Sequence, residues 1–533
     1  MGQIGKPPCD DGVILHGDAA LRCSARTRRW TLVAAILGSS LAFMDGTIVN
    51  VALPAIQREL SATTSDAQWV MESYALFLAS LLLVGGVLGD RFGRRRIFMI
   101  GAALFAVSSI GCSLSADIHQ LIAARAVQGV GAALLVPGSL ALISINFPKS
   151  ERGAAIGTWS AFSGITAAVG PVVGGFLVEH YSWTWAFLVN VPVSAALLLI
   201  CMTKVPESRG SGGSGTIDVL GACMATLGLA GVVFALIEAP AQGWMAPPIW
   251  IAAGVGLGAL AFFIRVEAHS AAPMMPLSLF RERNFAGANL LTLLLYAALG
   301  GSLFFLPLNL IQVQGYGATS AGAALLPFIA IVFALSRWAG TLVDLFGSKP
   351  PLVVGPIVAA AGFVMFAVPS IDSNYWTAFF PAICILGLGM SITVAPLTTT
   401  VMNAVGSELA GTASGINNAV SRTAALLAIA IFGIILTWAF DITLNEELMR
   451  VQAPTELVSA VMSQRQRLAG IVIPDGYSAS VTSAVRHAIG MSFVAGYRRV
   501  MLVSAALALL SAMSALVLIK GKAIVDPSVR RSG

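Results

Sequence analysis

The chain consists of apolar blocks of about twenty residues, separated by short polar stretches. A helix of that length crosses the ~30 Å hydrocarbon core of a bilayer, where every backbone polar group must be satisfied within the segment. Only 11% of the 533 residues are charged, whereas about 25% is usual in soluble domains. So little charge could not cover the surface of a water-soluble protein of this size. The sequence therefore predicts an all-α integral membrane protein that crosses the bilayer many times.

Fourteen blocks are long enough to span the membrane, and they fall into groups of six, two and six. The first block follows three arginines, as the apolar region of a signal peptide does, but it is longer, contains Asp45 and lacks a small-residue cleavage site. We therefore expect it to be the first spanning helix. The predicted helices run near 31–54, 67–89, 96–115, 120–145, 153–178, 184–203, 217–238, 248–267, 285–312, 319–345, 350–370, 374–402, 411–440 and 496–519.

Basic residues gather in alternate loops, except that the loop around Glu408 is not basic. Because basic loops remain on the cytoplasmic side, fourteen helices place both termini in the cytoplasm. The net charge of +6 then reflects orientation in the membrane and not binding of nucleic acid. We expect a cytoplasmic tail over 1–29, a six-helix bundle over 30–203, a linker with two inserted helices over 204–283, a second bundle over 284–520 with an extracytoplasmic loop at 441–495, and a cytoplasmic tail over 521–533.

The two groups of six helices are related in sequence. The segment Gly86–Arg94 recurs as Gly340–Ser348 at an offset of 254 residues, and two weaker pairs follow at offsets of 253 and 258. Three matches in the same order at nearly one spacing indicate an internal repeat, which is the architecture of secondary transporters. The pair of helices at 217–267 has no counterpart and is expected to be an insertion between the repeats.

Several kinds of chemistry leave no signal in the sequence. The six cysteines are scattered without a CxxC or a Cys/His ligand spacing, and the five histidines fall in tails or loops. A phosphate-binding loop of the GxxxxGK[ST] type does not occur. The sequence therefore predicts no metal, no cofactor, no use of ATP and no catalytic residues.

The repeated turn between the second and third helices carries the clearest motif. In Gly86–Arg96, a glycine permits a tight turn, an aspartate can accept from backbone N–H groups and arginines anchor the turn at the membrane surface. This turn resembles the signature loop of the major facilitator superfamily. The resemblance implies two six-helix repeats, here with two extra central helices, and cytoplasmic gate loops. The predicted gate-loop residues are Gly86, Asp90, Arg91, Gly93 and Arg94, with Asp344 and Gly347 in the second copy.

Four further segments resemble those of the fourteen-helix drug:proton antiporters, which include exporters of quaternary-ammonium cations. Asp45–Pro54 resembles their first-helix motif and Arg125–Ala133 their fourth-helix motif. The segment Trp183–Pro192 resembles the one that follows their fifth helix, but Thr184 stands where a basic residue is common. The fifth-helix antiporter motif itself is matched by Gly164, Gly170, Pro171, Gly174 and Gly175. These glycines permit close helix packing, and the proline kinks the helix.

Three ionisable residues lie inside predicted helices. Asp45 is roughly 20 Å from the cytoplasmic end of the first helix, and Glu72 and Arg125 lie in the outer half of the second and fourth. Ionisable groups in spanning segments are costly and usually face the bundle interior or a wet cavity. The competing interpretations are local capping for Asp45, snorkelling for Arg125 and an ordinary headgroup-level residue for Glu72. In the second repeat, Ala298 and Ile383 stand at the positions equivalent to Asp45 and Arg125.

These features predict an antiporter that exchanges an inward-moving proton for a cationic or lipophilic compound in the cytoplasmic (inner) membrane. Burial favours the neutral form of a carboxyl group and a neighbouring arginine favours its charged form, so a conformational change can load and release a proton. Asp45, Glu72 and Arg125 are the predicted coupling residues. Aromatic side chains suit flat cations, and the candidates are Phe43, Trp159, Phe162, Phe304 and Phe305.

Two alternatives to this function remain to be weighed. The same cycle could export an endogenous metabolite or biosynthetic product. A membrane enzyme or sensor would need a catalytic or ligand constellation or a soluble domain, and the sequence has neither. The sequence carries no information on an outer-membrane or periplasmic partner.

Overall fold

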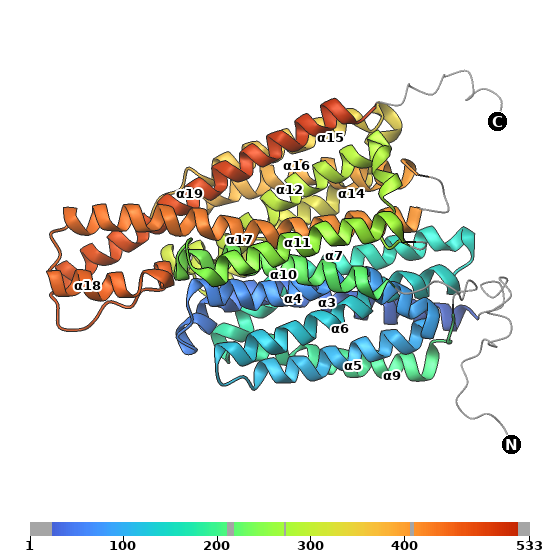
Figure 1. Cartoon of the computed structure of the whole chain (residues 1–533), viewed down its shortest axis with the longest axis horizontal. Helices are drawn as coiled ribbons and strands as arrows, with labels where there is room; N and C mark the ends of the chain where they lie inside the picture. Colours follow the sequence, from blue (N-terminus) through green and yellow to red (C-terminus); the bar gives the residue numbers. More distant parts are fainter. Residues whose placement is uncertain (1–23, 210–217, 271–272, 406–409, 521–533) are drawn as a thin grey trace. The chain divides into compact units, whose positions relative to one another are not determined.

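The computed structural model describes residues 24–209, 218–270, 273–405 and 410–520 (Figure 1). All regular structure in these ranges is helical. Fourteen helices within them are long and apolar enough to cross a membrane, which confirms the predicted number. The residues around Glu408, the tail residues 1–23 and 521–533 and the side chain of Asp344 lie outside what the structure describes.

The helices pack into two units. One unit holds the described residues up to Met274 together with Tyr316–Ala323, and the other holds Met275–Gly315 and the described residues from Ala324 onward. The first unit therefore contains the first six spanning helices and the inserted pair. Its helices are α3 (Ala25–Glu59), α4 (Thr64–Phe92), α5 (Arg94–Ser113), α6 (Ile118–Asn146), α7 (Lys149–His180), α8 (Trp185–Leu188), α9 (Asn190–Lys204), α10 (Val219–Gln242), α11 (Pro247–His269) and the short α13 (Ala318–Ala323).

Small residues let the helices of the first unit approach closely. A Cβ on Gly85 of α4 would collide with the Ala133 carbonyl of α6, and one on Gly131 of α6 would meet the backbone of Phe105 on α5. The inserted helices use the same device, because Gly231 of α10 lies against Gly256 of α11. α6 consequently packs against α3, α4 and α5, while α10 packs against both α11 and α4.

Close helix packing at small residues also shapes the second unit, where α12, α17 and α19 pack against one another. Its elements are the 3₁₀ turn η1 (Leu277–Arg281), α12 (Arg283–Leu308) with the π-helical turn η2 (Asn309–Val313), α14 (Leu326–Phe346), α15 (Lys349–Phe366), the π-helical turn η3 (Tyr375–Phe379), α16 (Phe380–Asn403), α17 (Ala410–Arg450), α18 (Thr455–Ser463), the 3₁₀ turn η4 (Arg465–Gly470) and α19 (Ala479–Leu518). The tenth spanning segment, predicted as one helix near 319–345, is divided into α13 and α14.

The segment 441–495, expected to be a long polar loop, is mostly helical. α17 continues to Arg450, α19 already begins at Ala479, and α18 lies between them (Figure 1). This helical structure was not expected, because the polar residues of the segment cover one side of amphipathic helices, whereas its extracytoplasmic location stays a prediction. Apolar residues at helical spacing, such as Leu444 with Leu448 and Leu457 with Val461, are 0–2% exposed.

Candidate functional site

A buried ion pair joins two helices of the first unit. Asp45 lies in the middle of α3 and Arg125 in the second turn of α6, and both side chains are 0% exposed. The Nη1 group of Arg125 donates to Oδ2 of Asp45. Removing either charge alone would leave the other buried and unpaired, which typically costs about 3–5 kcal/mol. The structure thus brings together two of the three predicted coupling residues.

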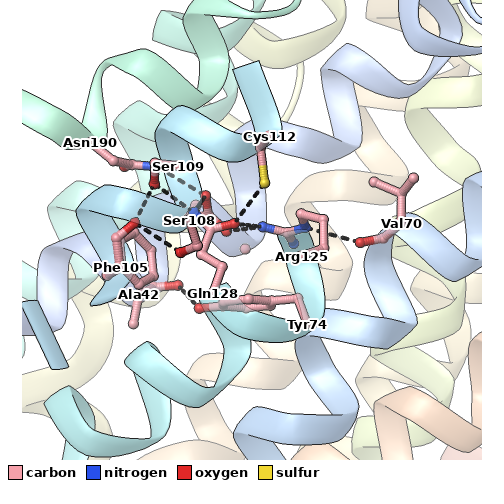
Figure 2. A network of polar contacts seen from close by, with 12 residues as sticks. Ala42, Val70, Tyr74, Phe105, Ser108, Ser109, Cys112, Arg125, Gln128 and Asn190 are labelled. Carbon is pink, nitrogen blue, oxygen red and sulfur yellow. Dashed lines mark hydrogen bonds and ion pairs between the residues drawn. The ribbon is translucent and has the colours of Figure 1, made fainter. Parts of the chain in front are cut away.

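Two neutral amides, those of Gln128 and Asn190 (Figure 2), complete the surroundings of the Asp45 carboxylate. Gln128 donates to its Oδ1 over 2.9 Å, and Asn190 donates to the same oxygen over 3.0 Å. Gln128 also accepts from Arg125 over 2.7 Å and donates to the Ser109 hydroxyl over 2.9 Å. Residues from α5, α6 and α9 therefore converge on one carboxylate of α3.

The guanidinium of Arg125 has two further partners on α4. Its Nε donates to the Val70 carbonyl over 3.0 Å, and its Cζ lies 4.3 Å from the centre of the Tyr74 ring. The Tyr74 hydroxyl in turn donates to the Ala42 carbonyl of α3 over 3.0 Å. A ring face attracts a cation, most strongly where water is excluded. Nη2 of Arg125 is left without a hydrogen-bond partner among the described residues.

Glu72 lies outside this network, although it belongs to the same stretch of α4. Its side chain is 0% exposed, and neither carboxylate oxygen has a hydrogen-bond partner in the described part of the chain. An unpaired buried carboxylate destabilises the folded protein. A proton or a cation bound to Glu72 would therefore offset that cost. The competing headgroup-level interpretation does not agree with a fully buried side chain.

The turn between α4 and α5 has the geometry expected of a tight, charged loop. Gly93 joins the two helices with φ of +110°, a conformation that glycine adopts without strain. Arg94 donates to the Asp90 carboxylate over 2.7 Å. Arg91 lies over the neighbouring Phe92 ring, with its Cζ 5.4 Å from the ring centre. Gly86, one turn before Asp90 on α4, has the Pro137 side chain of α6 as its neighbour. In the second copy, Gly347 also has a positive φ, of +75°.

Glu207, which the sequence analysis did not single out, closes this turn from the other side. Its carboxylate accepts from the backbone N–H groups of Arg95 and Arg96 over 3.0 and 3.1 Å, at the N-terminus of α5. Negative charge is favoured at that end of a helix. A carboxylate shortly after the sixth apolar block was the available signal, but its partner could not be read from spacing.

The antiporter motif of α7 forms two packing contacts. Gly170 and Gly174 lie against Met44 and Ile48 of α3, whereas Gly175 lies against the Ala318 carbonyl of α13. The carbonyl of Pro171 lies against Gly322, also in α13. Gly164 differs, since a Cβ there would meet nothing within 4 Å.

The candidate aromatic residues are divided between the two units. In the first unit, Trp159 donates to the Ser39 hydroxyl over 2.9 Å, while Phe162 is 50% exposed and Phe43 is half-buried. In the second unit, Phe304 and Phe305 are buried and contact each other edge to face. These positions do not identify a binding pocket for a flat cation.

Gln128, Asn190 and Ser109 were not among the predicted site residues, although they surround the Asp45–Arg125 pair, which together with them is called the Asp45–Arg125 centre below. Gln128 stands three residues after Arg125, on the same side of a helix, and Asn190 belongs to the segment that resembles the antiporters. Both could have been suspected as polar residues in apolar blocks. Among the described residues, no group of three or more His, Cys, Asp or Glu could hold a metal ion.

The fourteen apolar helices of the described residues, together with the family and the relatives given next, make the chain a multi-pass membrane transporter and not an enzyme. The chain belongs to the major facilitator superfamily, whose family model matches residues 35–429. It is 35% identical over 426 residues to the multidrug resistance protein Stp of Mycobacterium tuberculosis, covering 80% of this chain and 79% of Stp. It is 34% identical over 414 residues to the tetracenomycin C resistance and export protein of Streptomyces glaucescens, covering 77% and 76%.

A solved structure supports the fold. The chain is similar to a bacterial homolog of the human lysosomal transporter Spinster in an inward-facing, unoccupied conformation, with a TM-score of 0.64 and 18% identity over 94% of this chain and 100% of that chain. The likeness agrees with the helical architecture of the chain.

Proposed function

We propose that this transporter exports cationic or lipophilic compounds across the cytoplasmic membrane in exchange for protons. The observation that carries the proposal is the buried Asp45 carboxylate, which has one charged partner and two neutral ones. A proton that binds Asp45 neutralises the carboxylate and so weakens its hold on Arg125. Resistance and export proteins among the relatives support the direction of transport.

Glu72 has the complementary role of attracting the positive charge of a substrate. Its carboxylate has no partner among the described residues, and a cation is stabilised strongly by a carboxylate where the effective dielectric constant is low. The turns that contain Gly93 and Gly347 act as gate loops on the cytoplasmic side. The basic clusters near the ends of the chain support cytoplasmic termini.

Inside-out membrane vesicles provide the test. A proton gradient, acidic inside, should drive uptake of ethidium, and an uncoupler should abolish that uptake. Asp45→Asn should remove the response to the gradient while the variant is still inserted in the membrane. Ethidium uptake that survives both the uncoupler and Asp45→Asn would refute proton coupling through this residue.

Export of a biosynthetic product by the same cycle is a second candidate, favoured by the relative that is named as a tetracenomycin C resistance and export protein. A strain that lacks the transporter would then retain a metabolite that the parent strain secretes. Comparing the culture media of the two strains by mass spectrometry distinguishes this candidate from general drug export.

A further inference from the structure

The two inserted helices contact the rest of the first unit at a specific polar point. Glu238 is the one charged residue of α10, and its Oε1 accepts from the indole Nε1 of Trp69 on α4 over 2.9 Å. The Trp69 ring also lies 6.2 Å from the ring of Phe234, one turn earlier on α10. A hydrogen bond to a carboxylate is among the stronger kinds, especially in a partly buried interface.

Trp69 is the first residue of the short segment of α4, Trp69–Tyr74, that contacts Arg125 of the Asp45–Arg125 centre. The Val70 carbonyl accepts from Arg125, and the Tyr74 ring lies beneath the same guanidinium. Glu72 lies three residues after Trp69, on a neighbouring part of the helix surface. Arg125 therefore holds this segment on one side, and Glu238 holds it on another.

We propose that Glu238 is a positioning residue for the centre: by fixing Trp69, it sets where α4 presents the Val70 carbonyl to Arg125 and the Glu72 carboxylate to a substrate. The inserted pair α10–α11 thereby takes part in transport and is more than a lipid-facing addition. This inference rests on the function proposed above.

The contact offers variants that separate its parts. Trp69→Phe removes the indole N–H and keeps a ring beside Phe234. Glu238→Gln keeps an oxygen that can accept from Trp69, whereas Glu238→Ala keeps none. Gln242 donates to the opposite oxygen of Glu238 over 3.0 Å, so Gln242→Ala is a matched control that leaves the Trp69 bond in place.

The experiment measures ethidium transport in proteoliposomes and hydrogen exchange over Trp69–Tyr74 in the purified full chain. Glu238→Ala and Trp69→Phe should each raise the KM for ethidium about tenfold, as expected for the loss of a hydrogen bond to a charged group. Both should speed exchange in that segment, and the double variant should be no worse than either single variant. Glu238→Gln and Gln242→Ala should stay near the parent values.

The proposal is overturned if Glu238→Ala leaves both the KM and the exchange of Trp69–Tyr74 unchanged, or if Gln242→Ala is as damaging as Glu238→Ala. A purely structural role would lower thermal stability in Glu238→Ala without changing the KM, which also contradicts the proposal. The Asp45→Asn variant separates a failure of proton coupling through Asp45 from a failure of the positioning role of Glu238. If it still responds to a proton gradient, the proposed function fails, while the hydrogen exchange still reports whether Glu238 holds α4.

Discussion

Asn190, the first residue of α9, donates its side-chain amide to the Asp45 carboxylate of α3 over 3.0 Å. Gln128 donates to the same oxygen, whereas Arg125 donates to the other one. The two oxygens thus have different partners: neutral amides on one side and a cation on the other. We expect the amides to keep Asp45 oriented while a proton or a substrate competes with Arg125.

Asn190→Ala should lower the rate of proton-driven export about tenfold or more, because a hydrogen bond to a charged group contributes ~1.5–3 kcal/mol. Initial rates of ethidium efflux, normalised to the amount of protein in the membrane, measure this effect. Ser139→Ala is the control, since Ser139 is equally buried and donates to the Leu135 carbonyl of its own helix. Equal rates for Asn190→Ala and Ser139→Ala would contradict the role of the amide.

Arg125→Gln should destabilise the protein by about 3–5 kcal/mol, because it removes the cationic partner of a buried carboxyl group. The double variant Asp45→Asn, Arg125→Gln removes both charges and should recover much of that loss. Thermal unfolding in detergent, followed by intrinsic fluorescence, compares the parent, Asp45→Asn, Arg125→Gln and the double variant. Additive losses in the double variant would mean that the two residues do not act as a pair.

Glu72→Gln should affect cations selectively. Export of ethidium should require about tenfold more substrate, because the cation loses its counter-charge in a region from which water is excluded, while export of a neutral lipophilic compound should be unchanged. Thermal stability should not fall, since an unpaired buried carboxylate is removed. Parallel losses for charged and neutral compounds would count against a substrate-binding role. Glu446→Gln, at an exposed position of α17, controls for a general change of charge.

Gly93→Ala and Glu207→Ala should both weaken the junction of α4 and α5. A Cβ at Gly93 would lie 2.9 Å from the Glu207 carboxylate, and φ of +110° is strained for alanine. Glu207→Ala leaves the backbone N–H groups of Arg95 and Arg96 without their acceptor, at a cost of about 1–2 kcal/mol. Protease cleavage near this turn and thermal unfolding give the measurement. Unchanged cleavage in both variants would argue that the contact is dispensable.

The sequence was sufficient for the helix count and for the ionisable residues, because charges are rare in apolar blocks and therefore conspicuous. It could not show that Asp45 contacts Arg125 but not Glu72. The sequence indicates how deep each residue lies along its helix, but not toward which neighbouring helix its side chain points. Asn190 and Gln128 are uncharged and escaped attention for that reason. Ala298 and Ile383, at the positions equivalent to Asp45 and Arg125, are 0% and 1% exposed.

The segment 441–495 shows a different limit. Hydropathy separates spanning helices from polar segments, but it does not distinguish a polar loop from amphipathic helices outside the bilayer. The spacing of Leu444, Leu448, Leu457 and Val461 carried that information. Glu207 shows a similar limit, because a carboxylate beside a linker is unremarkable until the backbone of α5 is seen to lie against it.

The glycines of α7 give the last prediction, which uses a contrast within one motif. A Cβ at Gly175 would collide with the Ala318 carbonyl of α13, and one at Gly174 would collide with Ile48 of α3, while the space beside Gly164 is open. Backbone atoms cannot move aside as a flexible side chain does, so Gly175→Ala should separate α7 from α13, typically at a cost of about 1–3 kcal/mol.

Gly164→Ala should be neutral or slightly stabilising, since alanine is the better helix former by about 1 kcal/mol. If the α7–α13 contact seals the pathway, Gly175→Ala should also let protons leak through proteoliposomes that contain no substrate, as read by a trapped pH indicator. Gly174→Ala, which disturbs α3 and not α13, should lower stability without the leak. Equal leak rates for the Gly164 and Gly175 variants would show that the contact with α13 does not seal the protein.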